Sequence, residues 1–186
     1  MRLLIMGPPG AGKGTQAKRI GEHYAIPAIS TGDIFRAMQT ADTPLARQVR
    51  EIMASGGYVS DEITNQIVAE RLADADCEPG FLLDGYPRTL KQVDNLDAHL
   101  ASVGKPLDKV VSLTANEDEV VDRLLKRAQI EGRADDNEET IRKRQQVYAE
   151  QTAPLLEVYA DRGLLVEVDG LGSVDEVSER IFAALG

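Results

Sequence analysis

Short apolar runs alternate with longer amphipathic stretches along the 186 residues of this chain. The apolar runs have the length and the flanking turn residues of buried strands, and between them apolar side chains recur at helical spacing. Strands that alternate with helices predict an α/β fold, in which helices cover both faces of a parallel sheet and a site forms at the carboxyl ends of the strands. The predicted five strands are residues 2–6, 26–30, 81–84, 109–114 and 164–168.

Capping residues and helix breakers mark several boundaries in the second half of the chain. Ser173 and Glu176 have the spacing of a capping box that opens the last helix. A long helix is expected from about residue 137, and Pro154 should bend it or divide it in two. Helical periodicity stops after Arg127, so residues 128–136 are predicted to be a short mobile loop.

Composition favours one compact domain. Hydrophobic residues make up 42% of the chain and charged residues 28%, which is ordinary for a globular protein, and no run is long enough to cross a membrane. The start of the sequence lacks the pattern of a secretory signal, so we expect a cytoplasmic location. Cys77 is the single cysteine, which excludes an internal disulfide and a zinc site built from several cysteines.

The net charge of −10, from 31 acidic against 21 basic residues, argues against nucleic acid or an anionic membrane as a partner held by bulk electrostatics. An anionic ligand would have to be met by local positive charge. Arginines that lie within motifs are therefore the residues to examine.

A phosphate-binding loop follows the first predicted strand. Gly7, Gly12 and Lys13 fit the G-x-x-x-x-G-K pattern, in which backbone N–H groups surround a phosphate and the lysine reaches the outer phosphates. The segment after the loop predicts a helix whose positive N-terminal end faces the phosphates. Gly14 replaces the usual Ser or Thr, so Thr15 carries the nearest hydroxyl. The alternative, a chance glycine-rich turn, does not explain why strand, loop and helix occur in this order.

Asp84 ends the third predicted strand. In P-loop enzymes an aspartate in this place holds Mg²⁺, directly or through water. Without the phosphate loop, Asp84 would be interpreted as a residue that caps the next turn. Together the two motifs favour a magnesium site and a P-loop NTPase-like five-stranded sheet.

Six sequence segments occur in the order typical of one family, which the chain resembles over essentially its whole length: the adenylate kinases, which convert ATP and AMP into two ADP. The segments are GPPGAGKGT, STGDIFR, Gly57-Tyr58-Val59, FLLDGYPR with Gln92, GRADD and ETIRKR. The resemblance implies one domain over residues 1–186. Its core would comprise residues 1–29, 60–125 and 137–186, with a helical insertion for the nucleoside monophosphate at 30–59 and a short lid at 126–136.

The resemblance also implies the residues of the two nucleotide sites. ATP would contact Gly10, Ala11, Gly12, Lys13, Gly14, Thr15, Arg123, Arg127 and Gly172, with Arg123 stacked on the base. AMP would contact Thr31, Arg36, Gly57, Tyr58, Val59, Gly85, Tyr86, Pro87, Arg88, Gln92, Arg133 and Arg144. The catalytic set would be Lys13, Arg36, Asp84, Arg88, Arg127, Arg133 and Arg144, with Asp84 as the Mg²⁺ residue.

The chemistry agrees with this set of cations. Phosphoryl transfer depends on positioning and on neutralising charge, and guanidinium groups bind phosphate oxygens in pairs. The acceptor phosphate has a second pKa of about 6 and is mostly dianionic at neutral pH, so no general base is needed. For each arginine, a solvated surface charge is the alternative.

Gln92 and Thr31 address the choice of base. The Gln92 amide can accept from the amino group of adenine and donate to a ring nitrogen, and the Thr31 hydroxyl is expected nearby. Guanine and uracil present a carbonyl in place of that amino group, which would leave the amide mispaired. In the similar UMP/CMP kinases the position of Thr31 is typically Ala, so this chain is predicted to prefer AMP.

Five residues lie between Arg127 and Arg133, where longer family members carry a hairpin that sometimes binds zinc. The resemblance therefore implies no zinc, and it implies that residues 30–59 and 126–136 close over the substrates to exclude water. Two other functions stay open: a kinase acting on UMP or CMP, and a regulatory module that hydrolyses or senses ATP. A purely structural domain would not explain an exposed glycine loop ending in lysine. A monomer is expected, because no helix shows a surplus apolar face.

Overall fold

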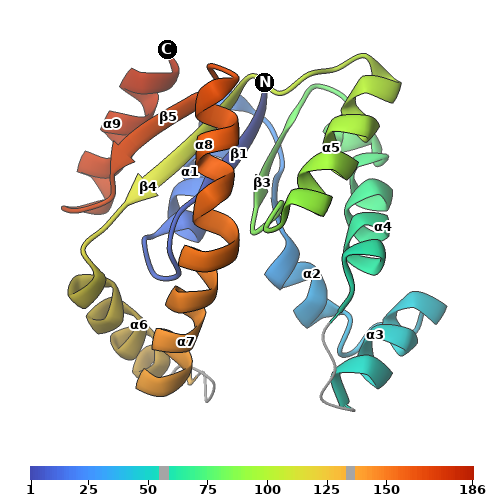
Figure 1. The fold of residues 1–186 in the computed structure, drawn as a ribbon, viewed down its shortest axis with the longest axis horizontal. Helices are drawn as coiled ribbons and strands as arrows, with labels where there is room; N and C mark the ends of the chain where they lie inside the picture. Colours follow the sequence, from blue (N-terminus) through green and yellow to red (C-terminus); the bar gives the residue numbers. More distant parts are fainter. Residues whose placement is uncertain (55–58, 133–136) are drawn as a thin grey trace.

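The computed structural model describes residues 1–54, 59–132 and 137–186, and it contains the predicted five-stranded parallel sheet (Figure 1). The order of the strands is β2-β3-β1-β4-β5. The connection after β1 runs to β2 on one side of the sheet, and the connection after β3 runs to β4 on the other side. The loops after β1 and β3 therefore lie at the point where ligands of such sheets bind. The strands are β1 (Arg2–Met6), β2 (Ala28–Ser30), β3 (Phe81–Asp84), β4 (Lys109–Thr114) and β5 (Leu165–Asp169).

The register of the parallel pairs brings the ends of the central strands together. Ile5 of β1 pairs with Asp84 of β3, and Met6 pairs with Ser112 of β4. Ser30 of β2 also pairs with Asp84. The segments that follow β1, β2 and β3 therefore start side by side at one edge of the sheet.

Helices connect the strands and extend past them. They are α1 (Lys13–Tyr24), α2 (Thr31–Ala37), α3 (Pro44–Ala54), α4 (Asp61–Leu72), α5 (Leu90–Val103), α6 (Glu117–Glu131), α7 (Glu138–Val147), α8 (Ala153–Asp161) and α9 (Val174–Leu185), with a 3₁₀ turn at Ala75–Cys77 and a π-helical turn at Tyr148–Thr152. None of the helices within the described ranges has both the length and the apolar character that crossing a membrane requires.

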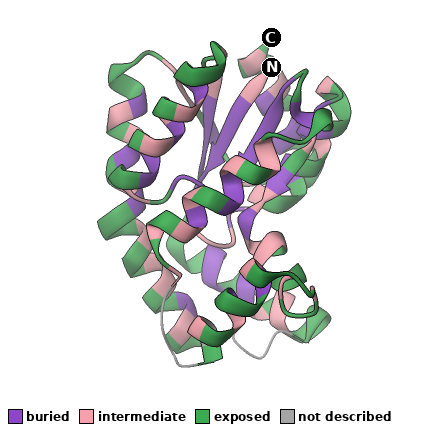
Figure 2. Ribbon diagram, turned by 90° about the vertical axis from the view of Figure 1, so that its right-hand side faces the viewer, coloured by how far each residue is buried: buried purple, intermediate pink, exposed green. Residues whose placement is uncertain are grey.

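The alternation of side chains along β1 divides the core into two layers. Leu3 and Ile5 point to the face covered by α1 and α9, and Leu4 and Met6 point to the face covered by α5 and α8. Figure 2 shows the buried sheet between helices whose outer sides are exposed. The buried helix residues of the first face include Ile20, Val177 and Ile181, and those of the second include Val93, Leu96, Leu100, Leu155 and Tyr159. The prediction of helices on both faces is confirmed.

Two pairs of helices lie beyond the carboxyl ends of the strands. In Figure 1, α2 and α3 lie below β3 on one side, and α6 and α7 lie below β4 on the other. Val120, Val121 and Leu124 of α6 pack against Ile141 of α7 in a small core of their own. The edge of the sheet that carries the motifs is therefore flanked by helices on two sides.

The loop predicted from residue 128 begins later than expected. Helix α6 continues to Glu131 and ends at Gly132, which has a left-handed backbone (φ 64°) as helix-terminating glycines do. Ile130 is 84% exposed, so the apolar pattern stops while the helix does not. The prediction of a loop was wrong for residues 128–131, and the rest of that prediction, residues 133–136, lies outside the described residues.

Pro154 divides the long helix as predicted. Helix α7 ends at Val147, a π-helical turn follows, and α8 begins at Ala153 with Pro154 in its first turn. The side chain of Thr152 in the π-helical turn donates a hydrogen bond to the carbonyl oxygen of Arg88 (3.2 Å). The capping box of Ser173 and Glu176 is also confirmed.

Candidate active site

The phosphate loop connects β1 to α1 at the centre of the sheet edge. Gly10 and Gly12 both have left-handed backbones, with φ of 84° and 95°. A Cβ atom built on Gly10 would lie 2.7 Å from Cγ of Leu124 and 3.0 Å from Cγ1 of Val120, whereas one built on Gly12 would meet nothing within 4 Å. The loop is therefore packed against helix α6 at Gly10 and open at Gly12.

This difference predicts unequal costs for two alanine substitutions. Gly12→Ala should lower the free energy of unfolding by about 1–2 kcal/mol, which is the cost of a left-handed backbone with a side chain. Gly10→Ala should cost about 2–4 kcal/mol, because overpacking against Leu124 and Val120 adds to the same backbone cost. Urea unfolding monitored by circular dichroism would measure both values. Equal losses for the two variants would contradict the packing of Gly10 on α6.

Lys13, at the start of α1, holds the loop through its ammonium group. Its Nζ donates to the carbonyl oxygens of Gly7 (3.0 Å) and Pro8 (3.2 Å). Burial lowers the pKa of Lys13 to about 8, the nearby Asp84 carboxylate opposes that shift, and the positive charges of Arg88 and Arg127 add to it. The lysine thus lies among other charged groups at the mouth of the loop.

The lowered pKa predicts an alkaline limb in the activity. Above pH 8 the free protein loses the Lys13 charge, so kcat/KM for ATP should fall about tenfold per pH unit, since kcat/KM reports the free enzyme. Unfolding would not cause this fall. The pKa is 10.5 unfolded and about 8 folded, so the unfolded chain binds more protons between these values and the free energy of unfolding rises with pH there. Initial rates measured from pH 7 to 10 would test the predicted fall in kcat/KM for ATP. The residual activity of Lys13→Met should not show this fall.

Asp84 lies at the end of β3, facing the start of α1. A Cβ atom built on Gly14 would lie 4.0 Å from Oδ2 of Asp84, so the carboxylate is next to the first turn of α1. Burial raises the pKa of the Asp84 carboxyl, and the positive charges of Lys13 and Arg88 oppose that shift. A cation bound here would meet a carboxylate oxygen beside the first turn of α1.

The donor set suits Mg²⁺ bound together with a nucleotide. Among the described residues, no cluster of three or more His, Cys, Asp or Glu side chains could hold a metal ion on its own. Mg²⁺ commonly takes one or two carboxylates and completes its octahedron with phosphate oxygens and water. Asp84 supplies such a carboxylate beside the phosphate loop. The exposed Thr15 carries a hydroxyl in the first turn of α1, which directly follows that loop.

The turn after β3 places Arg88 against the same edge. The carbonyl oxygen of Gly85 accepts hydrogen bonds from Nε of Arg88 (2.8 Å) and Oγ1 of Thr31 (3.1 Å). Gly85 has φ of 87°, and a Cβ atom there would lie 2.7 Å from the Thr31 hydroxyl. Burial lowers the pKa of Arg88, as does the charge of Arg144, whereas Asp84 raises it. Nε thus donates to the turn, and the two terminal nitrogens are the part of the Arg88 guanidinium that could bind a phosphate.

The structure brings most of the predicted cations together. The charges of Arg88 and Arg127 lower the pKa of Lys13, and the charge of Arg144 lowers that of Arg88. The charge of Arg36 lowers the pKa of the Asp84 carboxyl. Arg36 also forms an ion pair with Asp33 on α2. Positive side chains from α1, α2 and the turn after β3 therefore lie near the Asp84 carboxylate, and those of α6 and α7 lie near Lys13 and Arg88, despite the acidic net charge.

Arg123 and Gly172 lie at the end of the site nearest β5. Both terminal nitrogens of Arg123 donate to the carbonyl oxygen of Gly170 (3.3 Å each), and one also pairs with Glu119 (2.9 Å). Gly172 has a left-handed backbone (φ 111°) in the turn that precedes α9. Arg123 thus ties α6 to this turn. The resemblance implies that Arg123 and Gly172 each contact the ATP base.

The predicted base-recognition residues are held by the protein itself. Gln92 is 6% exposed; its Oε1 accepts from the backbone N–H of Arg88 (2.7 Å) and its Nε2 donates to Oδ1 of Asp61 (2.9 Å). Tyr86 is buried in the core, and its hydroxyl donates to Asn65 (2.6 Å). Tyr86 and the buried Pro87 lie in the turn that carries Arg88.

Two residues that contact the site, Asp61 and Thr152, were not identified from the sequence. Asp61 has the signature of an acidic residue in a first helical turn, and Thr152 is in a helix that Pro154 interrupts, so neither stands out as a partner of the site. Of the other predicted residues, Val59 is half-buried before α4. Gly57, Tyr58 and Arg133 lie outside the described residues.

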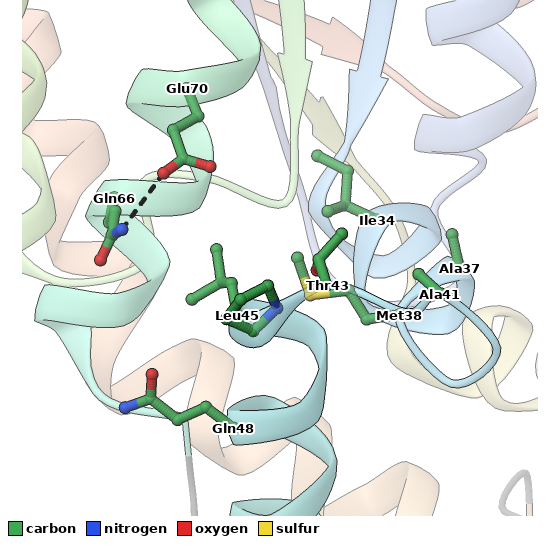
Figure 3. Close-up of a pocket in the computed structure, with 10 residues that line it drawn as sticks. Ile34, Ala37, Met38, Ala41, Thr43, Leu45, Gln48, Gln66 and Glu70 are labelled. Atoms are coloured by element: carbon green, nitrogen blue, oxygen red, sulfur yellow. Dashed lines mark hydrogen bonds between the residues drawn. The ribbon is translucent and has the colours of Figure 1, made fainter.

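An open groove of about 750 Å³ lies between α2, α3 and α4 (Figure 3). Ile34, Met38 and Leu45 line one part of it, and Gln66 and Glu70, which are hydrogen-bonded to each other, line the α4 side. None of the predicted site residues that the structure describes lines the groove. It shows that α2 and α3 are not closely packed against α4 over this stretch.

Comparison with known proteins agrees with this geometry. The family model for adenylate kinase matches residues 5–164. An adenylate kinase of Nocardioides sp. is 61% identical over 100% of this chain and 97% of its own length. Adenylate kinases of Leifsonia xyli subsp. xyli and Xanthomonas campestris pv. campestris are 61% and 52% identical, over 98% and 100% of this chain and 92% and 100% of their own lengths. The chain, with this phosphate loop and the arginines around it, belongs to the adenylate kinase family.

Proposed function

We propose that this chain transfers the terminal phosphoryl group of ATP to AMP, reversibly and in line, giving two ADP with Mg²⁺ bound to the nucleotide. The observation that carries this proposal is the pair of phosphate-binding elements at neighbouring strand ends. The loop after β1 offers Lys13 and the turn after β3 offers Arg88, with Asp84 between them. Two anions that bind these elements would meet at one point, as transfer between two nucleotides requires.

The charges divide between the two nucleotides. Lys13 and Arg127 would contact the phosphates of ATP, and Arg36 and Arg88 those of AMP. Arg144, together with Arg133, would close over the transferring group. A cluster of fixed cations stabilises charge on the equatorial oxygens of the transition state. The AMP phosphate needs no base, because it is mostly dianionic at neutral pH.

Asp84 and Thr15 are the residues that would hold Mg²⁺, directly or through water. The ion, when bound, neutralises the phosphate oxygens of ATP and orients them. Burial raises the pKa of Asp84, and a cation beside the carboxylate would lower it. The ionised carboxylate that Mg²⁺ needs is thus favoured by the ion itself.

Closure of two segments would exclude water from the transfer. The insertion at 30–59 contains α2 and α3, and the groove beside α4 leaves room for these helices to shift (Figure 3). The first six residues of the lid at 126–136 are the end of α6, and the lid precedes Asn137, the N-cap of α7. Water excluded by closure could not compete with AMP for the phosphoryl group.

Gln92 and Thr31 support adenine as the acceptor base. Thr31 is buried and already donates its hydroxyl proton to Gly85, so its oxygen is left to accept a hydrogen bond. Uracil and guanine present a carbonyl in place of the amino group of adenine and would leave the Gln92 amide mispaired. Cytosine shares the hydrogen-bonding pattern of adenine, and CMP is disfavoured by Thr31, which stands at a position that is typically Ala in the similar UMP/CMP kinases. We therefore favour AMP over UMP or CMP, and a two-substrate kinase over a module that hydrolyses or senses ATP alone.

The same proposal includes a monomer located in the cytoplasm, where ATP and AMP are balanced. Large apolar side chains are exposed only singly among the described residues: Leu90 and Val103 lie at opposite ends of α5, and Ile130, Val147 and Val174 lie on α6, α7 and α9. Scattered exposure of this kind does not form a patch for a partner.

Incubation with Mg-ATP and one acceptor at a time tests the function. Phosphorus NMR should show two ADP formed with AMP, and little transfer to UMP, CMP or GMP. Transfer to UMP or CMP instead would contradict the role of Gln92 and Thr31 while keeping the mechanism. Loss of ATP that does not depend on an acceptor would identify an ATPase and overturn the two-site assignment.

A further inference from the structure

The hydrogen bonds of the Gln92 side chain fix which way its amide points. A backbone N–H can only donate and a carboxylate can only accept. Arg88 N therefore requires the oxygen of the amide (2.7 Å), and Asp61 Oδ1 requires the nitrogen (2.9 Å). The orientation of this buried amide is thus set by the chemistry of its two partners.

These bonds leave one acceptor position and one donor on the amide. An amide has two acceptor positions on oxygen and two N–H donors, and the protein uses one of each on Gln92. The remaining pair could accept from the 6-amino group of a purine and donate to its N1. A 6-oxopurine presents the reverse pattern, with an acceptor at position 6 and a donor at N1.

Asp61 is itself held in place on both sides. It is the first residue of α4 and follows the insertion, and its second oxygen, Oδ2, accepts from the hydroxyl of Thr89 (3.2 Å). Thr89 caps α5 by accepting from the backbone N–H of Gln92 (3.3 Å). The carboxylate is therefore fixed against the first turn of the helix that carries Gln92.

We propose that Asp61 is a positioning residue that orients the Gln92 amide, so that the pocket accepts a 6-aminopurine monophosphate and rejects a 6-oxopurine. This inference rests on the proposed function, in which Gln92 faces the acceptor base. Asp61 does not touch the substrate and acts through the amide. Removing it leaves Arg88 N as the only partner among the described residues that sets the orientation.

The test compares AMP with IMP, which has the same shape with the reversed hydrogen-bonding edge. Asp61→Ala should lower the ratio of kcat/KM for AMP to that for IMP about tenfold, a change typical of one hydrogen bond to a charged group. Asp61→Asn keeps an acceptor oxygen and should stay within about threefold of the parent ratio. Gln92→Ala should abolish most of the preference.

Glu62→Ala is the matched control. Glu62 is the next acidic residue in the first turn of α4, and it is exposed, so its removal costs the same charge near the helix N-terminus without touching Gln92. The thermal midpoint should fall more in Asp61→Ala than in Glu62→Ala, because only the first substitution leaves the buried Nε2 of Gln92 without its acceptor. The AMP/IMP ratio of Glu62→Ala should equal that of the parent protein.

Side-chain amide signals in ¹⁵N–¹H NMR give a readout that needs no activity. One Gln92 Hε, assigned from its absence in Gln92→Ala, should be protected from exchange in the parent and in Glu62→Ala, and unprotected in Asp61→Ala. An unchanged AMP/IMP ratio in Asp61→Ala, or a Gln92 signal unaffected by it, would overturn the inference. If the parent made no ADP from AMP, the proposed function would fail. The ratio of dissociation constants for AMP and IMP, with the NMR signal, would then still decide the role of Asp61.

Discussion

Lys13→Met is expected to lower kcat/KM for ATP about a thousandfold, because it removes the cation that the phosphate loop aims at the outer phosphates. The side chain of methionine fills the space of the aliphatic part of lysine but carries no charge and no hydrogen-bond donor. Folding should not suffer. Burial lowers the pKa of Lys13 to about 8, so the protonated lysine opposes folding below that pH, and its removal relieves this cost. Steady-state kinetics with varied ATP, together with urea unfolding, would measure both effects.

Lys109→Met is the control for this change. Lys109 begins β4, at the opposite end of the strand from the site, so the substitution removes the same charge far from the phosphates. Its kinetic constants should match those of the parent. A loss below tenfold in Lys13→Met would mean that the phosphates of ATP are held by the loop backbone and the arginines without the lysine.

Arg88→Met should lower kcat/KM for AMP about a thousandfold, and Arg88→Lys about a hundredfold. Nε of the guanidinium donates a hydrogen bond to the carbonyl oxygen of Gly85 (2.8 Å), and its two terminal nitrogens would donate to a phosphate. A lysine restores the charge but cannot make both contacts, because its single ammonium lacks the planar fork. KM for ATP should change little, and this difference between the two substrates would assign Arg88 to the acceptor.

Arg142→Met provides the comparison for Arg88. Arg142 lies on α7, where it pairs with Glu138 (3.2 Å) and Glu117 (3.7 Å) at the surface, and exposed pairs of this kind contribute little to stability. Its activity should equal that of the parent. If Arg88→Met raised KM for ATP as much as KM for AMP, the assignment of Arg88 to one nucleotide would be wrong.

The central part of the fold could be predicted because its signals are local. The run from β1 through Gly12 to Lys13 contains strand, turn and helix signals within a few residues, and the end of β3 at Asp84 is equally clear. The end of α6 could not be found from apolar periodicity, since Ile130 is exposed while Ala128, Gln129 and Glu131 favour a helix by intrinsic propensity. Gly132, with its left-handed backbone, was the available signal.

Contacts between distant segments were the part that the sequence could not provide. Asp61 and Gln92 are 31 positions apart, and Thr152 and Arg88 are 64 apart. Each of these residues has an ordinary local explanation: a first-turn acid, a helix amide, a hydroxyl before a proline. Only the packing of α4 on α5, and of the π-helical turn on the turn after β3, shows that they position site residues.

The π-helical turn at 148–152 makes the length of this segment a condition of activity. Such a turn accommodates one residue more than an α-helix would, and each residue of an α-helix advances the chain by about 100° around the axis. Deleting any one of these five residues would remove the extra residue of the turn and change the rotation of α7 relative to α8, while Pro154 would still mark the boundary between them. Arg144 would then turn by about that angle relative to the core, away from Arg88. Substitutions at the exposed positions of the turn should be tolerated far better than a change of its length.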